Sequence, residues 1–494
     1  MTRPNNSQQN KDAVDAVYTA SATPPDYIMI LGSIDIVPHQ DLLNPLFGGD
    51  DDDEHAWGDL PYACDAPYSQ NISDFTKPTR VIGRLPDIQA MKNTAYFVKL
   101  LDNAAKWVSL APSSYDDYFA VSALTWQKST KLSVKKTFGS NEKVFVSPTA
   151  GPPWNAPDLA PLAHFINCHG NSGRSAFYGE DPNATGEAKY PIAHQTIHVR
   201  NFIEPGTVAA VECCFGAELY KPHADIDPEH GICQEYLYDD AYGFFGATTI
   251  AYGPAVGHGA ADIICAAFLK HVRAGDSLGL AALAARQDFI KACDVMDPID
   301  LKTLGQFNLL GDPSIHPVHA AAKATGKTLA AAKKSPEALN TARAEQPALD
   351  DGYRQRREDL RASAARVAGK VSMASTHVPD PLMDSRARAA AQAAGITPSD
   401  VKTFELQRPT NAPRRKAMAG MKAVMAPPAP ARICVVTGRT SDQQPPAAHQ
   451  VPAKGKGVTK GKDGGHPGPS PFVVAVMKER LDGSMTMVRK VFSK

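Results

Sequence analysis

Two stretches of this sequence end in side chains that could act together as a thiol nucleophile and its proton donor. The apolar stretch 162–168 is followed by His169, and the apolar stretch 207–213 ends at the neighbouring residues Cys213 and Cys214. A cysteine attacks as its thiolate, and an imidazole can supply or hold the proton. The residue types therefore predict nucleophilic catalysis, provided that the fold brings the two stretches together.

Both stretches are predicted to be buried strands. Each is a short apolar run bounded by glycine or proline, a pattern typical of strands that are covered on both faces. In an open parallel sheet, ligands bind outside the carboxyl ends of the strands. A histidine at one strand end and a cysteine at another would then share a crevice. A lone cysteine is more often a buried small hydrophobe. The prediction of a catalytic site therefore depends on finding both a cysteine and a histidine at strand ends.

The two neighbouring cysteines cannot both face the histidine. Successive side chains along a strand point to opposite faces of the sheet. Only one of Cys213 and Cys214 can therefore be directed at His169. The other is expected to be a buried small hydrophobe, and so is Cys168.

The composition gives no support to several classes of function. Lys and Arg total 52, as do Asp and Glu, so no net charge favours nucleic acid or an anionic membrane. No apolar run reaches the length of a membrane span, and residues 1–11 lack the apolar core of a signal peptide. The 8 cysteines are scattered, which suits a reducing compartment. We expect a cytoplasmic protein, with a secreted protein as the alternative.

Strand-like and helix-like stretches alternate between residues 26 and 318. Further strands are predicted at 26–32, 80–86, 118–124, 144–146 and 241–252, and helices at 87–108, 129–138, 259–273 and 277–293. The apolar face predicted for the first helix consists of Ile88, Met91, Ala95, Val98 and Leu101. The alternation predicts an α/β fold in which helices sandwich a parallel sheet.

The composition also divides the chain into regions. Residues 1–25 are predicted to be disordered, and the alternating strands and helices follow over 26–318. Residues 319–430 are rich in Ala, Arg and Lys, which suggests isolated helices, such as 355–371, joined by linkers.

The last region, 431–494, is predicted to be a small β unit with a disordered insert. The insert, 441–470, is rich in Lys, Gly and Pro. Asp-Gly between apolar runs predicts a hairpin centred on 481–483, which 433–436 is expected to join. A lone hairpin is marginally stable, so we expect it to dock on the catalytic part or on a partner. We expect 319–494 to serve recruitment or regulation rather than catalysis.

Two groups of residues in the sequence could bind a metal ion. The acidic loop 50–54 could bind structural Ca²⁺, although it lacks the ligand spacing of an EF-hand. A group of cysteine and histidine residues within one part of the chain could bind zinc, although no pair has the spacing of a structural zinc site. These residues are Cys168, His169, Cys213, Cys214, His223, His230 and Cys233. The alternative function is therefore a zinc-binding or catalytically inactive scaffold that recruits partners through its C-terminal region.

Five short motifs are similar to those of one enzyme family. They are 57–62 (Trp-Gly-Asp-Leu-Pro-Tyr), 81–86 (Val-Ile-Gly-Arg-Leu-Pro), 167–170 (Asn-Cys-His-Gly), 275–279 (Gly-Asp-Ser-Leu-Gly) and 307–314 (Phe-Asn-Leu-Leu-Gly-Asp-Pro-Ser). With them the chain resembles, over about residues 26–318, the gingipain-like cysteine peptidases, in the clan of caspases, legumains and clostripain. The resemblance implies a caspase-like fold of two subdomains, an N-terminal α/β subdomain over 26–110 and a catalytic subdomain over 111–318. It also implies hydrolysis of peptide bonds in protein or peptide substrates, with no required cofactor.

The resemblance also implies a mechanism. Across the clan the nucleophile follows a small residue that ends a strand, which puts Cys213 in the small-residue place and Cys214 in the nucleophile place. His169 would protonate the leaving amine. The backbone N–H groups of Gly170 and Cys214 would stabilise the oxyanion, which is often worth about 10²–10³ in rate.

The substrate side of the site is less well defined by the motifs. Arginine-cleaving relatives place an acid at the start of the helix after the strand predicted at 118–124. Here that stretch, 126–130, holds no acid, so the preferred residue before the cut bond stays open. Trp126 could wall the pocket, and Asn167 and Glu212 could bind substrate or orient the catalytic pair.

Overall fold

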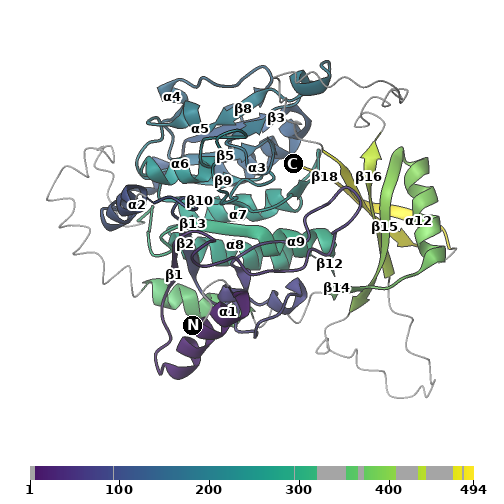
Figure 1. Ribbon diagram of the computed structural model, residues 1–494, viewed down its shortest axis with the longest axis horizontal. Helices are drawn as coiled ribbons and strands as arrows, with labels where there is room; N and C mark the ends of the chain where they lie inside the picture. Colours follow the sequence, from purple (N-terminus) through teal and green to yellow (C-terminus); the bar gives the residue numbers. More distant parts are fainter. Residues whose placement is uncertain are drawn as a thin grey trace, which may run out of the picture.

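The centre of the computed structural model is an eight-stranded sheet (Figure 1). The structure describes residues 6–92, 94–293, 295–319, 352–364, 372–407, 432–440, 471–480 and 483–494. In sheet order the strands are β1 (Ile28–Leu31), β2 (Ile82–Leu85), β13 (Phe307–Gly311), β10 (Gly243–Ala247), β9 (Val208–Val211), β5 (Ala163–Asn167), β3 (Tyr118–Ala123) and β4 (Val144–Ser147). Neighbours are parallel except β10 with β13. The predicted α/β fold is confirmed.

Helices cover both faces of this sheet, as the continuous apolar strands predicted. On one face lie α3 (Gln127–Phe138), α7 (Ala261–Arg273) and α8 (Leu278–Ala292); on the other lie α2 (Ala95–Ala105), α5 (Thr196–Val199) and α6 (Ile232–Tyr238). Successive strand residues alternate between the two cores. Phe165 and Ala210 pack towards α7, whereas Ile166 and Val211 pack towards α6.

The helix predicted at 87–108 is shorter and turned differently. It begins at Ala95, and the chain before it takes a left-handed turn at Ala90 (φ 57°). Its buried residues are Tyr96 and Leu100, and the Tyr96 hydroxyl donates to the Gln234 carbonyl at 2.8 Å. Three members of the predicted apolar face, Met91, Val98 and Leu101, are exposed. A tyrosine with a buried polar partner, and not the aliphatic stripe, decides which face is covered.

The predicted disorder of residues 1–25 is wrong for most of that stretch. Helix α1 (Ser7–Ala20) lies under the main domain, and the Asn6 side chain caps it. Fully buried Lys11 binds Asp15 and donates to the Cys64 carbonyl at 3.1 Å. Polar contacts to other parts of the chain hold this helix in place. Such contacts require no helical periodicity of apolar residues, so the sequence does not reveal them.

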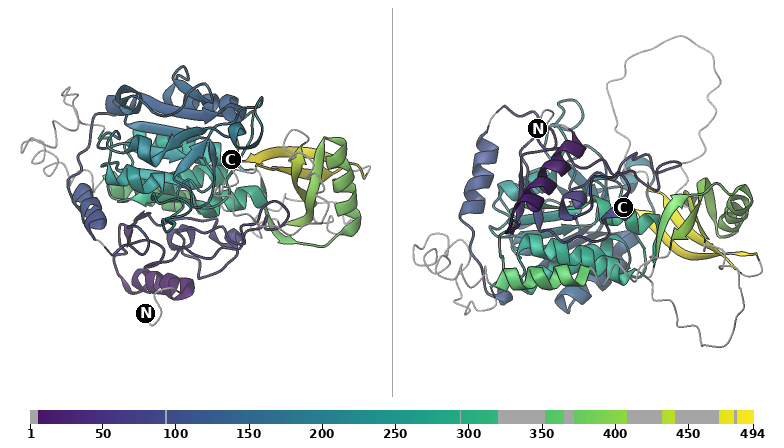
Figure 2. Two further views of the ribbon diagram at one scale, coloured as in Figure 1. Left: turned by 45° about the horizontal axis from the view of Figure 1, so that its top comes forward. Right: turned by 90° about the horizontal axis from the view of Figure 1, so that it is seen from below.

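A second, seven-stranded sheet contains the C-terminal part of the chain (Figure 2). In sheet order its strands are β11 (Tyr252–Gly253), β18 (Met485–Ser493), β17 (Val473–Glu479), β16 (Arg432–Thr440), β15 (Ile396–Gln407), β14 (Ser372–His377) and β12 (Val295–Met296). The predicted hairpin of β17 and β18, and its pairing with β16, are confirmed. We call β14–β18 and α12 (Pro381–Ala393) the β unit.

The expectation of isolated helices over 319–430 is wrong for 372–407, which forms β14, α12 and β15. A helix does span 352–364, which overlaps the predicted 355–371. Residues 365–371 and the predicted insert 441–470 lie outside the described residues. Long-range strand pairing orders the 372–407 stretch, and composition does not reveal such pairing.

The β unit is joined to the main domain at both edges of its sheet. Strand β11 pairs with β18, and β12 pairs with β14, and both β11 and β12 belong to the region predicted to be catalytic. The last strand therefore leads back to the main domain, and the C mark lies where the two parts meet (Figures 1 and 2).

Three of the motifs that carry the family resemblance meet at one buried junction. The Asp59 backbone N–H donates to the Asn308 side chain at 2.8 Å, and the Asp59 carboxylate accepts two bonds from Arg84, at 2.9 and 2.7 Å. Although burial raises the pKa of Asp59, the charges of Arg84 and His39 hold it well below its ordinary range. The motifs therefore share a structural role, namely fixing β2 and β13 together.

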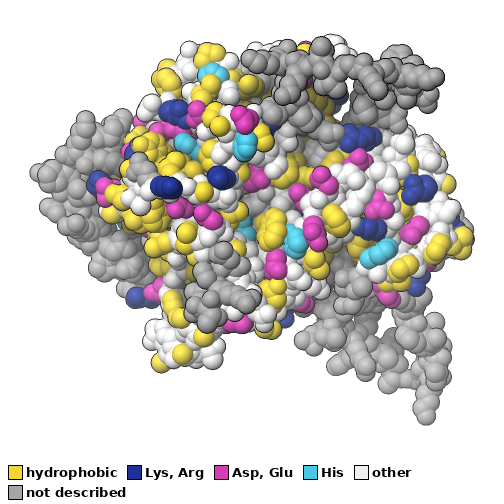
Figure 3. Space-filling model, viewed as in Figure 1, with side chains coloured by type: hydrophobic (Ala, Val, Ile, Leu, Met, Phe, Trp, Pro, Cys, Tyr) yellow, Lys and Arg dark blue, Asp and Glu magenta, His cyan; other side chains and the backbone are white. Residues whose placement is uncertain are grey.

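The surface carries no dominant charge on the face shown in Figure 3, where basic and acidic side chains are interspersed. This agrees with the equal totals of the two kinds in the sequence. Within the part of the chain that the structure describes, no helix combines the length and the apolar character that crossing a membrane requires.

Candidate functional site

The two predicted strand ends meet at one edge of the main sheet. Strands β5 and β9 are parallel neighbours, with Ile166 opposite Val211. After β5 the chain continues into β6 (His169–Gly170), which pairs with β7 (Ala176–Tyr178) in a three-stranded sheet with β8 (Ile192–Gln195). The backbones touch, since a Cβ on Gly170 would lie 1.7 Å from the carbonyl oxygen of Cys214.

The neighbouring cysteines belong to opposite faces of the sheet. The Cys213 Sγ accepts from the Cys168 backbone N–H at 3.3 Å, within the core beneath α6. The Cys214 Sγ accepts from the Ala251 backbone N–H at 3.3 Å, on the α7 side. Burial raises the pKa of both thiols, so each is protonated at neutral pH and attack requires removal of a proton.

The chain turns sharply directly after Cys214. Phe215 has a φ of 55°, a left-handed conformation that is rare for a bulky residue. Its N–H donates to the Thr249 carbonyl at 3.0 Å, which helps to hold the turn. Such strained residues cluster at active sites, where the surrounding fold must impose them.

His169 is enclosed by aromatic rings and one carboxylate. Its ring centroid lies 4.4 Å from that of Trp126 and 5.2 Å from that of Tyr190, both edge-on. Its Nε2 lies 3.3 Å from a carboxylate oxygen of Glu180, which also pairs with Lys189. Although burial raises the pKa of Glu180, the hydrogen bond with His169 and the Lys189 charge lower it. The carboxylate therefore orients the ring through Nε2 and leaves Nδ1 for another partner.

An extended segment of the chain, 492–494, lies across Cys214. The Cys214 N–H donates to the Lys494 carbonyl oxygen at 3.2 Å, and the Lys494 N–H donates to the Ala251 carbonyl at 2.9 Å. The two residues before Lys494 continue the antiparallel pairing, with Ser493 opposite Tyr252. The Lys494 carbonyl oxygen is thus held by the backbone N–H of a cysteine.

The Lys494 side chain ends in a buried acidic pocket. Its Nζ donates to Glu212, at the end of β9, and to Asp262, in the first turn of α7, the latter at 3.0 Å. The three side chains are fully buried, and the Nζ lies 5.6 Å from the centroid of the Trp126 ring. Burial and the Asp262 charge raise the pKa of Glu212, and the two carboxylates, opposed by burial, raise that of Lys494.

The acidic loop 50–54 binds a lysine. Fully buried Lys302 donates to Asp51 at 2.9 and 3.0 Å and to Asp53 at 2.9 Å, and the Tyr252 hydroxyl donates to Asp51. Asp53 also accepts the Ile250 N–H at 2.8 Å. The loop therefore supports the strand that faces segment 492–494. Among the described residues, no group of three or more His, Cys, Asp or Glu is arranged to hold a metal ion, so neither the Ca²⁺ nor the zinc hypothesis gains support.

The predicted substrate-binding residues separate into two sets. Trp126 and Glu212 both lie at the Lys494 side chain. Asn167 instead donates to the Thr130 hydroxyl on α3 at 2.9 Å. Sequence reasoning missed Asp262 and Glu180. Asp262 lies near the start of a predicted helix, which is a weak signal for an acid, and Glu180 lies in a loop that shows no pattern.

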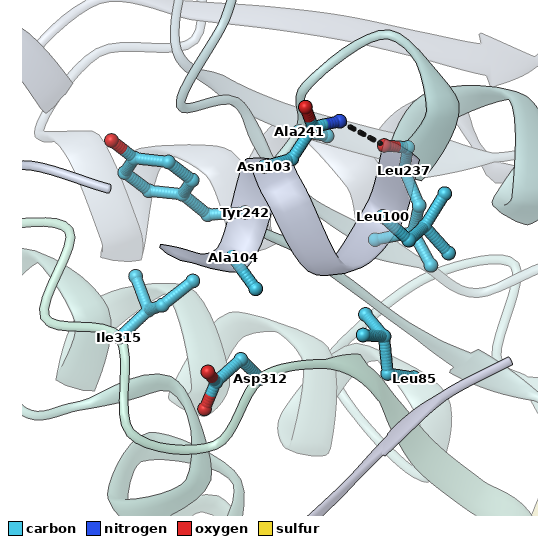
Figure 4. Close-up of a pocket in the computed structure, with 9 residues that line it drawn as sticks. All are labelled: Leu85, Leu100, Asn103, Ala104, Leu237, Ala241, Tyr242, Asp312 and Ile315. Carbon is cyan, nitrogen blue, oxygen red and sulfur yellow. Dashed lines mark hydrogen bonds between the residues drawn. The ribbon is translucent and has the colours of Figure 1, made fainter. Parts of the chain in front are cut away.

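A small hollow lies elsewhere in the fold (Figure 4). It has room for about one water molecule, with a volume of about 10 Å³. Its lining includes Leu85, Leu100 and Asp312, and Asn103 donates to the Leu237 carbonyl beside it at 3.4 Å. It lies where β10 begins, at the sheet edge opposite Cys214, and plays no part in the site described above.

No protein-family model and no curated protein matches the sequence. Solved structures do show likeness. One is described only as a protease, with 13% identity, a TM-score of 0.42, and coverage of 64% of this chain and 70% of that one. The Arg-specific cysteine proteinase gingipain R has 10% identity and a TM-score of 0.41, with coverage of 63% and 68%. The separase–securin complex of Saccharomyces cerevisiae has 11% identity and a TM-score of 0.29, with coverage of 48% and 14%. Gingipain, the family that the sequence motifs suggest, is thus among the solved structures that this chain is similar to.

Proposed function

We propose that this protein is a cysteine endopeptidase in which Cys214 is the nucleophile and His169 the proton carrier. One observation carries the proposal, namely the peptide segment 492–494 laid across Cys214 with a carbonyl oxygen on the Cys214 N–H. A protein that hydrolyses peptide bonds must hold an extended chain in this way, by strand addition beside the nucleophile.

The proposed reaction begins with proton transfer. The Cys214 thiol turns away from the Ala251 N–H, and His169 takes its proton. The thiolate sulfur then bonds to the carbonyl carbon of the substrate, and the oxyanion is held by the N–H groups of Cys214 and Gly170. His169 returns the proton to the leaving amine as the peptide bond breaks, and water hydrolyses the thioester that remains.

Two matched cysteine variants test the assignment. Cys214→Ala should abolish cleavage of a fluorogenic peptide library, because no other side chain can form the thioester. Cys213→Ala should keep most of the activity, because that thiol packs against Cys168 in the opposite core. Circular dichroism establishes that both proteins are folded. Loss of activity in Cys213→Ala alone would assign the nucleophile to Cys213, and full activity in both variants would rule out a thiol mechanism.

A further inference from the structure

The side chain of Lys494 enters a pocket that is built for a cation. Two carboxylates, Glu212 and Asp262, contact its ammonium group, and none of the three side chains is exposed to solvent. Buried carboxylates are costly unless a cation and hydrogen bonds compensate them. The second oxygen of Asp262 accepts the Gly259 N–H at 3.2 Å, which fixes the carboxylate in place. The pocket is therefore completed by an ammonium group and incomplete without one.

The shape of the pocket also fits a straight aliphatic stem. A Cβ on Gly253 would lie 2.0 Å from Cε and 2.5 Å from Nζ of Lys494, so the stem passes directly over the glycine backbone. The Trp126 ring faces the ammonium group from another side, where a cation is attracted by the π-electrons. An arginine side chain reaches one atom further and ends in a broad, planar guanidinium, so a matched arginine peptide tests whether the pocket distinguishes the two cations.

The backbone of the same segment adopts the position of a substrate. The Lys494 carbonyl oxygen is on the Cys214 N–H, its N–H is on the Ala251 carbonyl, and Phe492 pairs with Gly253. The residue whose carbonyl carbon the thiol would attack is thus the residue whose side chain fills the acidic pocket. A surface ion pair that merely anchors a strand would not also place a carbonyl at the proposed oxyanion site.

We infer that the pocket of Glu212 and Asp262 selects lysine as the residue before the cut bond, and that segment 492–494 occupies it as a built-in competitor of substrate. The inference rests on the proposed function, since a cut bond presupposes the peptidase. The acids come from the end of β9 and from α7, and not from the start of α3, where the sequence of the arginine-cleaving relatives places one.

The first test measures cleavage by the full chain and by Lys494→Ala. The substrates are matched peptides with lysine, arginine or norleucine before the cut bond. Emptying the pocket should raise kcat/KM for the lysine peptide at least about tenfold, because a tethered competitor has an effective concentration of about millimolar. Lysine should exceed norleucine by about 100-fold or more, because norleucine leaves two buried carboxylates unpaired. Glu212→Gln and Asp262→Asn, each combined with Lys494→Ala, should shrink that preference.

The second test measures binding without catalysis. Calorimetry with acetyl-Phe-Ser-Lys-amide and its norleucine analogue on the double variant Cys214→Ala/Lys494→Ala, which lacks the nucleophile, should show binding of the lysine peptide only. Cleavage that prefers norleucine or arginine would overturn the lysine inference and leave the proposed function standing. Binding of the lysine peptide with no cleavage of any substrate would support the lysine pocket and overturn the proposed function. An unchanged rate in Lys494→Ala would mean that the ion pair only anchors β18. If Lys494→Ala does not fold, cleavage of the same lysine, arginine and norleucine peptides by the unaltered chain shows which residue is preferred before the cut bond.

Discussion

At the scale of single residues, the proposed catalytic pair depends on a carboxylate that the sequence did not reveal. Glu180 holds the Nε2 of His169 at 3.3 Å and is itself held by Lys189. Such a carboxylate keeps a catalytic imidazole in one orientation and stabilises it when it carries the proton. His169, Gly170 and Cys214 could be proposed from strand ends and motifs. Glu180 could not, because its contact with His169 depends on how the loop after β7 folds back.

Glu180→Gln should lower kcat about tenfold or more and leave KM nearly unchanged, because the group acts on His169 and not on substrate. The pKa of Glu180 is lower than the ordinary value of about 4.3, so the carboxylate is ionised throughout neutral and mildly acid pH. Its effect on His169 is lost only as the pH falls through the lowered pKa. The ionisation of Glu180 itself should therefore add no pH dependence to kcat across neutral and mildly acid pH. Steady-state kinetics from pH 5 to pH 8 checks this. A change confined to KM would show that Glu180 contacts substrate instead.

At the scale of elements, continuous apolar runs predicted the central strands correctly, because burial on both faces leaves a local signature. Elements that are held by polar contacts or by strand pairing with distant parts of the chain have no such local signature. Helix α1 depends on Lys11 and its partners, and β15 depends on its pairing with β14 and β16. The sequence does not reveal Lys302 as a partner of the acidic loop 50–54, because it lies 251 residues away from Asp51 in the sequence.

Lys302→Met should lower the free energy of unfolding by about 3–5 kcal/mol, because it leaves Asp51 and Asp53 buried without their cation. Lys291→Met is the matched control. It changes an exposed lysine on α8 and should stay within about 0.5 kcal/mol of wild type. Urea denaturation followed by circular dichroism measures both. Equal stability of the two variants would mean that the Asp51–Lys302–Asp53 cluster does not support the strand beside Cys214.

At the scale of the whole molecule, the C-terminal region is part of the proposed active site. The sequence predicted a β unit that serves recruitment or regulation, and its hairpin was expected to dock on the catalytic part or on a partner. The structure has that hairpin, and its last strand ends in the pocket of Glu212, 282 residues away from Lys494 in the sequence. No local pattern could have joined them, because the pocket exists only after both sheets have formed. The composition of the C-terminal region therefore could not show that its last residue contacts this pocket.

The most direct measurement of the central claim is the mass of the protein after reaction with a peptide acyloxymethyl ketone, a reagent that alkylates the thiol of a working cysteine peptidase. Digestion and mass spectrometry of the unaltered chain and of Lys494→Ala should place a single adduct on Cys214, formed faster in the variant. The adduct should be absent from His169→Ala, which lacks the proton carrier. An adduct on Cys213, or no adduct on a folded protein at any reagent concentration that labels other cysteine peptidases, would contradict the account.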